Sequence, residues 1–246
     1  GILFENIKNW LNSIPIDSLK PNGIPRFFDD TPNEIVETFS HLNRIFLEID
    51  IPKYLAEILF IKMEFLIQYN IHSYYLVGTL AKVLPDKNYD INTYLRKGII
   101  SDKSDNSRNA MYGLFLWVQQ ALSSETQDTP LPSDDLIREI GLAIATRRKN
   151  TLIQALLAAT IIFKAQNSQL SSIISLLILE GLEYLILEQN YKSSHDDIED
   201  VPIIRLNCVK LAYQMSINGF GDKPIIKQWL DEGQQDPLPE IRNVIS

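Results

Sequence analysis

A short motif occurs twice near the C-terminal end of the chain and restricts the folds that the sequence can adopt. Pro202-Ile203-Ile204-Arg205 and Pro239-Glu240-Ile241-Arg242 share the pattern Pro-x-Ile-Arg, and their prolines lie 37 residues apart. A motif that recurs at this distance in a run of helical segments is typical of stacked helical repeats, which form a solenoid. We therefore expect an all-α fold built from stacked helices.

Helix geometry explains each residue of the motif. Proline is tolerated in the first helical turn because its missing N–H group would have no partner there. The isoleucine is expected to face the core, and the arginine is expected to point along the stack towards a carboxylate. An acidic residue precedes each arginine by six positions, namely Glu199 before Arg205 and Asp236 before Arg242.

Asp102 and Arg108 form a third and fainter copy without the proline. On these motifs the chain resembles the HEAT and armadillo-like helical repeat proteins, and Asp236–Arg242 is similar to the opening of the second helix of a HEAT repeat. The resemblance implies a right-handed superhelix of antiparallel helix pairs and implies no chemistry. Irregular arrays of this type are also similar to the C-terminal regions of large bacterial multidomain proteins.

Apolar residues that recur every three or four positions predict helices along the whole chain. Residues 169–190 are apolar nearly all round, so we expect neighbours to cover this helix on most sides. Gly219-Phe220-Gly221 and Gly233 are expected to cap helices at their C-terminal ends. The predicted helices cover residues 2–13, about 33–49, 52–65, 71–84, 91–99, 105–123, 133–147, 150–166, 169–190, 202–217, 223–231 and 238–246.

A polar stretch with two prolines, residues 123–132, is the best candidate for a long loop or a boundary between two halves. We expect one α-helical repeat domain over residues 1–246. Its irregular half covers about 1–124, and its more HEAT-like half covers about 133–246.

Composition restricts the partner and the compartment. The formal net charge of −8 disfavours nucleic acid as the partner, because sequence-independent binding depends on neutralising phosphates. Cys208 is the single cysteine, so the chain can form neither an intrachain disulfide nor a cysteine-rich zinc site. We recognise no signal peptide. The apolar run Ile173–Leu187 is interrupted by Glu180 and Glu183 and falls short of the roughly 20 apolar residues of a membrane span.

These features predict a cytoplasmic protein that does not enter a membrane. The first residue is Gly1 rather than Met, which is compatible with a piece of a larger polypeptide.

Cations near the starts of several helices are the candidate binding residues, since helices that begin with the same motif line one face of a superhelix. Two interpretations of the arginines remain open, because they can stabilise the stack or contact an acidic partner. The basic triplet at 147–149 can likewise complement a helix dipole or contact a phosphate or acidic peptide. The candidates are Arg108, Arg147, Arg148, Lys149, Arg205 and Arg242.

An acidic run offers an enzymatic alternative. Asp196, Asp197 and Asp200 form an Asp-Asp-x-x-Asp pattern, as in the magnesium-diphosphate motif of isoprenoid synthases, and carboxylates suit Mg²⁺. Only 46 residues follow Asp200, and the sequence offers no second metal motif or basic diphosphate clamp. Acidic residues just before a helix also complement its dipole.

The other reactive side chains give little support to catalysis. His41, His72 and His195 are isolated in sequence, and Cys208 is expected to be a small buried residue. We therefore expect a non-catalytic recognition or scaffold module without a cofactor, which binds a protein or another domain of a larger polypeptide. The alternatives are a magnesium-dependent isoprenoid-diphosphate enzyme that uses Asp196–Asp200, and a nucleic-acid-binding helical repeat.

Overall fold

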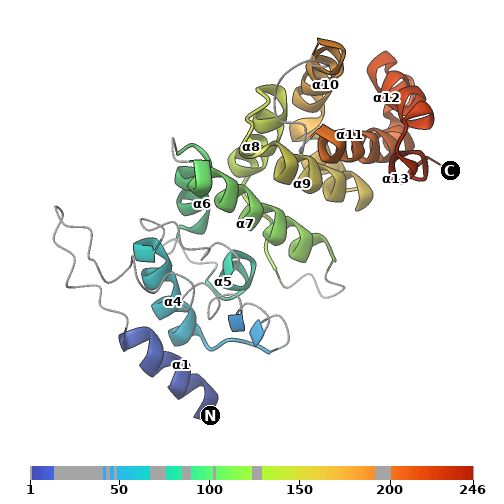
Figure 1. Cartoon of the computed structure of the whole chain (residues 1–246). Helices are drawn as coiled ribbons and strands as arrows, with labels where there is room; N and C mark the ends of the chain where they lie inside the picture. Colours follow the sequence, from blue (N-terminus) through green and yellow to red (C-terminus); the bar gives the residue numbers. More distant parts are fainter. Residues whose placement is uncertain are drawn as a thin grey trace. The chain divides into compact units, whose positions relative to one another are not determined.

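The computed structural model describes most of the chain, and every regular element in that part is a helix (Figure 1). The all-α prediction is therefore confirmed for these residues. The described residues are 2–13, 41–42, 45–46, 49–66, 76–84, 90–101, 104–123, 129–191 and 201–245. The helices are α1 (Ile2–Ser13), α4 (Lys53–Leu66), α5 (Val77–Val83), α6 (Ile91–Ile99), α7 (Ser104–Ser123), α8 (Asp134–Ala145), α9 (Leu152–Lys164), α10 (Ser168–Tyr191), α11 (Val201–Met215), α12 (Pro224–Gln235) and α13 (Pro239–Arg242), with a π-helical turn (Ser216–Phe220) after α11.

The chain divides into two compact units, Gly1–Leu131 and Pro132–Ser246. The division falls within the polar stretch 123–132, whose composition predicts a boundary. The single continuous array expected over residues 1–246 stays a prediction.

The N-terminal unit is held together by apolar contacts between successive helices. In it, α1 packs on α4, α4 on α5, and both α5 and α6 on α7. Leu59 of α4 and Leu80 of α5 are among the fully buried side chains of this unit. Trp117 of α7 is also buried, and its Nε1–H donates to the carbonyl of Pro130 at 2.8 Å. This bond fastens the end of the polar stretch to α7.

The helices of the C-terminal unit lie in two layers (Figure 1). In one layer α8 packs on α10 and α10 on α12, and in the other α9 packs on α11 and α11 on α13. Between the layers, α8 packs on α9, and α12 packs on both α11 and α13. The middle helix of each layer, α10 or α11, is therefore in contact with the helices before and after it in that layer.

Two glycines allow α8 and α10 to approach closely. Gly181 of α10 lies against the backbone of Ile144, where an added Cβ would come within 2.7 Å of the carbonyl carbon and oxygen. Gly141 of α8 lies against Leu177, whose Cδ1 would be 2.8 Å from an added Cβ. Each helix thus presents a glycine where the other helix comes nearest, and a side chain at Gly181 would meet backbone that cannot easily move.

The same turn ends both α8 and α9. The residue after each C-cap has a left-handed conformation, with φ of 51° at Arg147 and 53° at Gln166. The N–H of Arg147 donates to the carbonyl of Ile144, that of Arg148 donates to Ala143, and equivalent bonds close α9. This pattern is the Schellman motif, in which glycine usually occupies the left-handed position because side chains are strained there.

Some predicted boundaries differ from the structure. Gly233, expected to cap a helix, lies inside α12, where Val209 of α11 packs against it. Gly219 does follow a helix, with φ of 90° in the π-helical turn after α11. The last helix is the short α13 rather than a helix over 238–246. The helix expected at about 33–49 lies mostly outside the described residues.

α10 is covered on one side, whereas its apolar sequence predicts cover on most sides. Ile174, Ile178 and Leu182 are fully buried, but Leu176 is 79% exposed and Leu187 is 59% exposed. Among the described helices, α10 is long and apolar enough over Ser168–Leu187 to cross a membrane, by length and composition alone. Core helices of water-soluble proteins meet the same criterion, so this property is weak evidence for a membrane.

Candidate binding surface

The arginine of the first motif copy pairs with the acidic residue of the second copy. Arg205 of α11 donates from Nε to Oδ2 of Asp236 at 2.9 Å and from Nη2 to Oδ1 at 3.4 Å. The side chain of Asp236 is only 8% exposed, and that of Arg205 is 24% exposed. A two-bond contact between a guanidinium and a nearly buried carboxylate fixes the orientation of both groups. The pair therefore joins α11 to the end of α12.

Asp236 is also the centre of the turn between α12 and α13. Its Oδ1 accepts the backbone N–H of Leu238 at 2.9 Å. Arg242 donates from Nη1 to the carbonyls of Asp236 at 2.6 Å and Pro237 at 2.9 Å. Ile241, between these polar contacts, is buried as the motif predicts. Arg205 and Arg242 thus act on one turn from two different helices.

The three side chains of the basic triplet 147–149 lie in different environments. Nη1 of Arg148 lies 3.3 Å from Oε2 of Glu139, whose side chain is buried in α8. The guanidinium of Arg147 stacks on the ring of Tyr184 in α10, with its Cζ 4.9 Å from the ring centroid. Lys149 is exposed. Arg147 and Arg148 are therefore engaged with groups of the same unit.

The remaining candidates from the sequence are not brought together by the described structure. Arg108 is exposed on α7 of the N-terminal unit, and its expected partner Asp102 lies outside the described residues. The acidic candidates Asp196, Asp197 and Asp200 also lie outside them. A magnesium site at this acidic run therefore stays a prediction.

The histidines and the cysteine do not form a described cluster. His41 is exposed, while His72 and His195 lie outside the described residues. Within the described part of the chain, no group of three or more His, Cys, Asp or Glu residues could hold a metal ion. Cys208 is fully buried in α11, as predicted, and this burial raises the pKa of its thiol well above the ordinary value.

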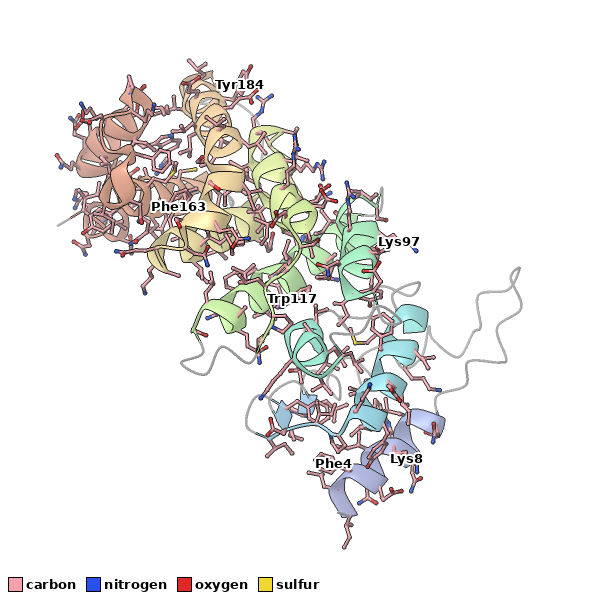
Figure 2. All side chains as sticks on the ribbon, turned by 180° about the vertical axis from the view of Figure 1, so that it is seen from behind. Phe4, Lys8, Lys97, Trp117, Phe163 and Tyr184 are labelled. Atoms are coloured by element: carbon pink, nitrogen blue, oxygen red, sulfur yellow. The ribbon has the colours of Figure 1, made fainter. Side chains whose placement is uncertain are left out.

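The exposed face of α10 was not identified from the sequence. Leu176 and Leu187 lie eleven residues apart, and Glu180 and Glu183 lie exposed between them. Tyr184 borders this face and is 44% exposed (Figure 2). We call these five residues the α10 stripe.

The α10 stripe combines apolar side chains with negative charge. Residues 176, 180, 183 and 187 recur at intervals of four, three and four, which places them on one side of a helix. The two glutamates inside the apolar run are the signal in the sequence that could have identified an exposed face, because a helix enclosed on all sides rarely carries unpaired charges.

Comparison of the chain with models of protein families, with curated proteins and with solved structures gives no match. The function is therefore inferred from the geometry of the chain alone.

Proposed function

We propose that the chain is a non-catalytic recognition module whose C-terminal unit is a short HEAT-like stack of helix pairs. The stack binds a protein partner, or another domain of a longer polypeptide, through its outer helical surface. The observation that carries this proposal is the contact of Arg205 with Asp236, because it links one copy of the repeated motif to the next.

The packing of the helices supports the same proposal. In stacked repeats, each helix contacts its counterpart in the neighbouring repeat, so helices two places apart along the chain must touch. The pairs α8 and α10, α9 and α11, α10 and α12, and α11 and α13 all do so. The pairs α8/α9, α10/α11 and α12/α13 would then correspond to three repeats, with the motif at the start of the second helix of the last two. Within the pairs, α8 packs on α9 and α12 on α13, whereas α10 packs mainly on α8, α9 and α12, and α11 mainly on α9 and α12.

The engaged arginines favour a structural role over ligand binding at the motif itself. Arg205 and Arg242 contact Asp236 and the turn that follows it, and Arg148 contacts Glu139. Replacing these arginines would test the fold rather than the binding surface. Recognition is therefore assigned to exposed side chains on the outside of the layers.

Partner capture followed by cross-linking tests this function. The full chain, immobilised through an N-terminal tag, is incubated with lysate of its native host and treated with a lysine-reactive cross-linker. We expect a retained protein whose cross-links map to exposed lysines of the C-terminal unit, namely Lys149, Lys164, Lys210, Lys223 and Lys227.

The matched control is Ile226→Asp, which places a charge at a fully buried position of α12 and disrupts the stack. A partner retained by the native chain and lost by this variant supports the proposal. Retention of no protein above the control, or cross-links confined to Lys53 and Lys97 of the N-terminal unit, would overturn it.

A further inference from the structure

The α10 stripe is an exposed apolar surface that carries its own negative charge. Leu176 is more exposed than any other large apolar residue of the described C-terminal unit, at 79%, and Leu187 follows at 59%, similar to Ile217 after α11 at 57%. Three helical turns, or about 16 Å, separate these two leucines along the axis. Glu180 and Glu183 occupy the interval between them.

A second copy of this chain is a poor occupant for the stripe. Closed dimers usually place the same surface of both copies around a two-fold axis. An antiparallel pairing of α10 with its copy, in the register that sets Leu176 opposite Leu187, also sets Glu180 opposite Glu183. Carboxylates would then face carboxylates in the centre of the contact, where juxtaposed like charges are unfavourable.

The same arrangement is complementary to a basic helix. A partner helix with two apolar residues three turns apart could cover Leu176 and Leu187, and Lys or Arg between them would meet Glu180 and Glu183. The chain as a whole is acidic, with a net charge of −8, so long-range attraction also favours a cationic partner.

The ring of Tyr184 is held in place at the edge of the α10 stripe. The guanidinium of Arg147 stacks on its ring at 4.9 Å, so the ring is held from the loop between α8 and α9. Tyrosine presents a large contact area at a small entropic cost, which is one reason for its frequency at the centres of interfaces. A partner helix would therefore meet a preorganised ring beside the two leucines.

We propose that the α10 stripe binds an amphipathic α-helix in which two apolar residues three turns apart flank Lys or Arg residues. This inference rests on the proposed function and specifies its surface and its partner class.

Fluorescence anisotropy with a labelled synthetic helix tests the inference on the full chain. The probe is an amphipathic peptide of about 18 residues, long enough to be partly helical in water, with leucines three turns apart and lysines between them. The control peptide has glutamates in place of the lysines. We expect the native chain to bind the lysine peptide about tenfold or more tightly than the glutamate peptide, as the loss of one strong contact would give.

Two double variants locate the binding. Leu176→Ser with Leu187→Ser should weaken binding of the lysine peptide by about tenfold or more. Glu180→Lys with Glu183→Lys should reverse the preference in favour of the glutamate peptide. Ile61→Ser removes a similarly exposed isoleucine from α4 of the other unit and should leave binding unchanged. All of these positions are exposed, so circular dichroism should show an unchanged helix content.

The inference is overturned if the native chain shows no preference for the lysine peptide, or if the double serine variant binds as the native chain does. It also fails if sedimentation shows a dimer of the native chain that the double serine variant loses, since a second copy then occupies the stripe. A captured partner that the double serine variant still retains leaves the recognition function standing and removes only this site.

Discussion

The carboxylate of Asp236 receives the guanidinium of Arg205 from a helix that begins more than thirty residues earlier in the chain, with Nε and Oδ2 2.9 Å apart. The contact links two copies of one sequence motif, and its carboxylate is almost removed from water. The charged carboxylate of Asp236 is tolerated in this buried position because Arg205 compensates it, since an uncompensated buried carboxylate is costly.

Arg205→Ala should destabilise the C-terminal unit by about 2–3 kcal/mol, because it leaves Asp236 without its cation. Asp236→Ala should have a comparable cost, since it also removes the acceptor for the N–H of Leu238. The double variant should cost less than the sum of the two single variants by about 1–2 kcal/mol. Hydrogen exchange of peptides from α11 and α12, read by mass spectrometry, gives the opening free energies.

Lys227→Ala provides the matched control, since Lys227 and Asp222 form an exposed pair 4.0 Å apart. We expect a change of less than about 0.5 kcal/mol there. Strict additivity of the Arg205 and Asp236 variants would show that the contact contributes no coupling between the motif copies.

Gly181→Ala should destabilise the contact between α8 and α10, although alanine is the better helix former. The added methyl would meet the backbone of Ile144 at 2.7 Å, and overpacking of this kind costs about 1–3 kcal/mol. That cost exceeds the gain in helix propensity of about 1 kcal/mol. Urea unfolding followed by circular dichroism should show a lower midpoint.

Gly141→Ala is the informative comparison, because the atoms nearest to its methyl would belong to side chains rather than to backbone. Its nearest contact would be Cδ1 of Leu177 at 2.8 Å, which can rotate away, and the Cβ of Leu177 at 3.0 Å would have to shift only slightly. We expect this variant to be closer to neutral than Gly181→Ala. If both variants stabilise the chain, close approach of the two helices at these glycines is not a constraint on the fold.

Gln166→Gly should stabilise the chain by about 0.5–1 kcal/mol, because it removes the strain of a left-handed side-chain residue from the Schellman turn of α9. Gln166 is exposed, so little packing is lost. Arg147→Gly relieves the same strain at α8 but loses the stacking on Tyr184, which is worth about 0.5–1 kcal/mol. Its net effect should therefore be near zero. Equal shifts of the unfolding midpoint in the two variants would contradict this difference.

Cys208 should react with iodoacetamide only when α11 opens. Its burial raises the pKa of the thiol and so disfavours the reactive thiolate in the folded chain. As the single cysteine, it reports on the C-terminal unit without interference. We expect negligible labelling in buffer and an increase in urea that follows unfolding of this unit. Rapid labelling of the native chain would show that α11 is not packed as described.

The sequence predicted the helices well because apolar spacing records which residues must be buried. The apolar spacing predicts a helix over 91–99, which are the bounds of α6. The missing N–H of proline predicts the positions of Pro202 and Pro239 near the starts of α11 and α13. Burial of Ile241 and Cys208 followed from the same pattern. These features depend on local geometry, which neighbouring residues determine.

Pairings between distant segments could not be predicted in the same way. The buried Glu139 that contacts Arg148 lies inside an apolar helix, and only tertiary packing brings the two together. The sequence predicts a cap at Gly233, whereas the structure places it inside α12, because a glycine in sequence fits either a helix end or a close contact. The sequence predicts cover on most sides of residues 169–190, and the exposure of Leu176 escapes this prediction because an apolar residue does not itself record whether another helix covers it.

The N-cap of α6 gives a prediction that depends on pH. Asp90 accepts the backbone N–H of Thr93 at 3.0 Å through Oδ1 and the Thr93 hydroxyl at 2.5 Å through Oδ2. The bond from the hydroxyl, followed by that from the N–H, lowers the pKa of Asp90 below 3.8, the value expected in the unfolded chain. The stabilisation is therefore fully present above about pH 3.8 and is lost as the pH falls through the lower, folded-state pKa.

Asp90→Ala should cost about 1 kcal/mol at pH 7, as the loss of a helix cap does. Asp90→Asn keeps an acceptor that does not titrate, so its advantage over Asp90→Ala should stay constant with pH. The advantage of the native chain over Asp90→Ala should instead shrink as the pH falls below 3.8. Hydrogen exchange of α6 between pH 7 and pH 3, compared among the three chains at each pH, measures both differences. A native advantage that does not change over this range would mean that Asp90 stabilises α6 without its charge.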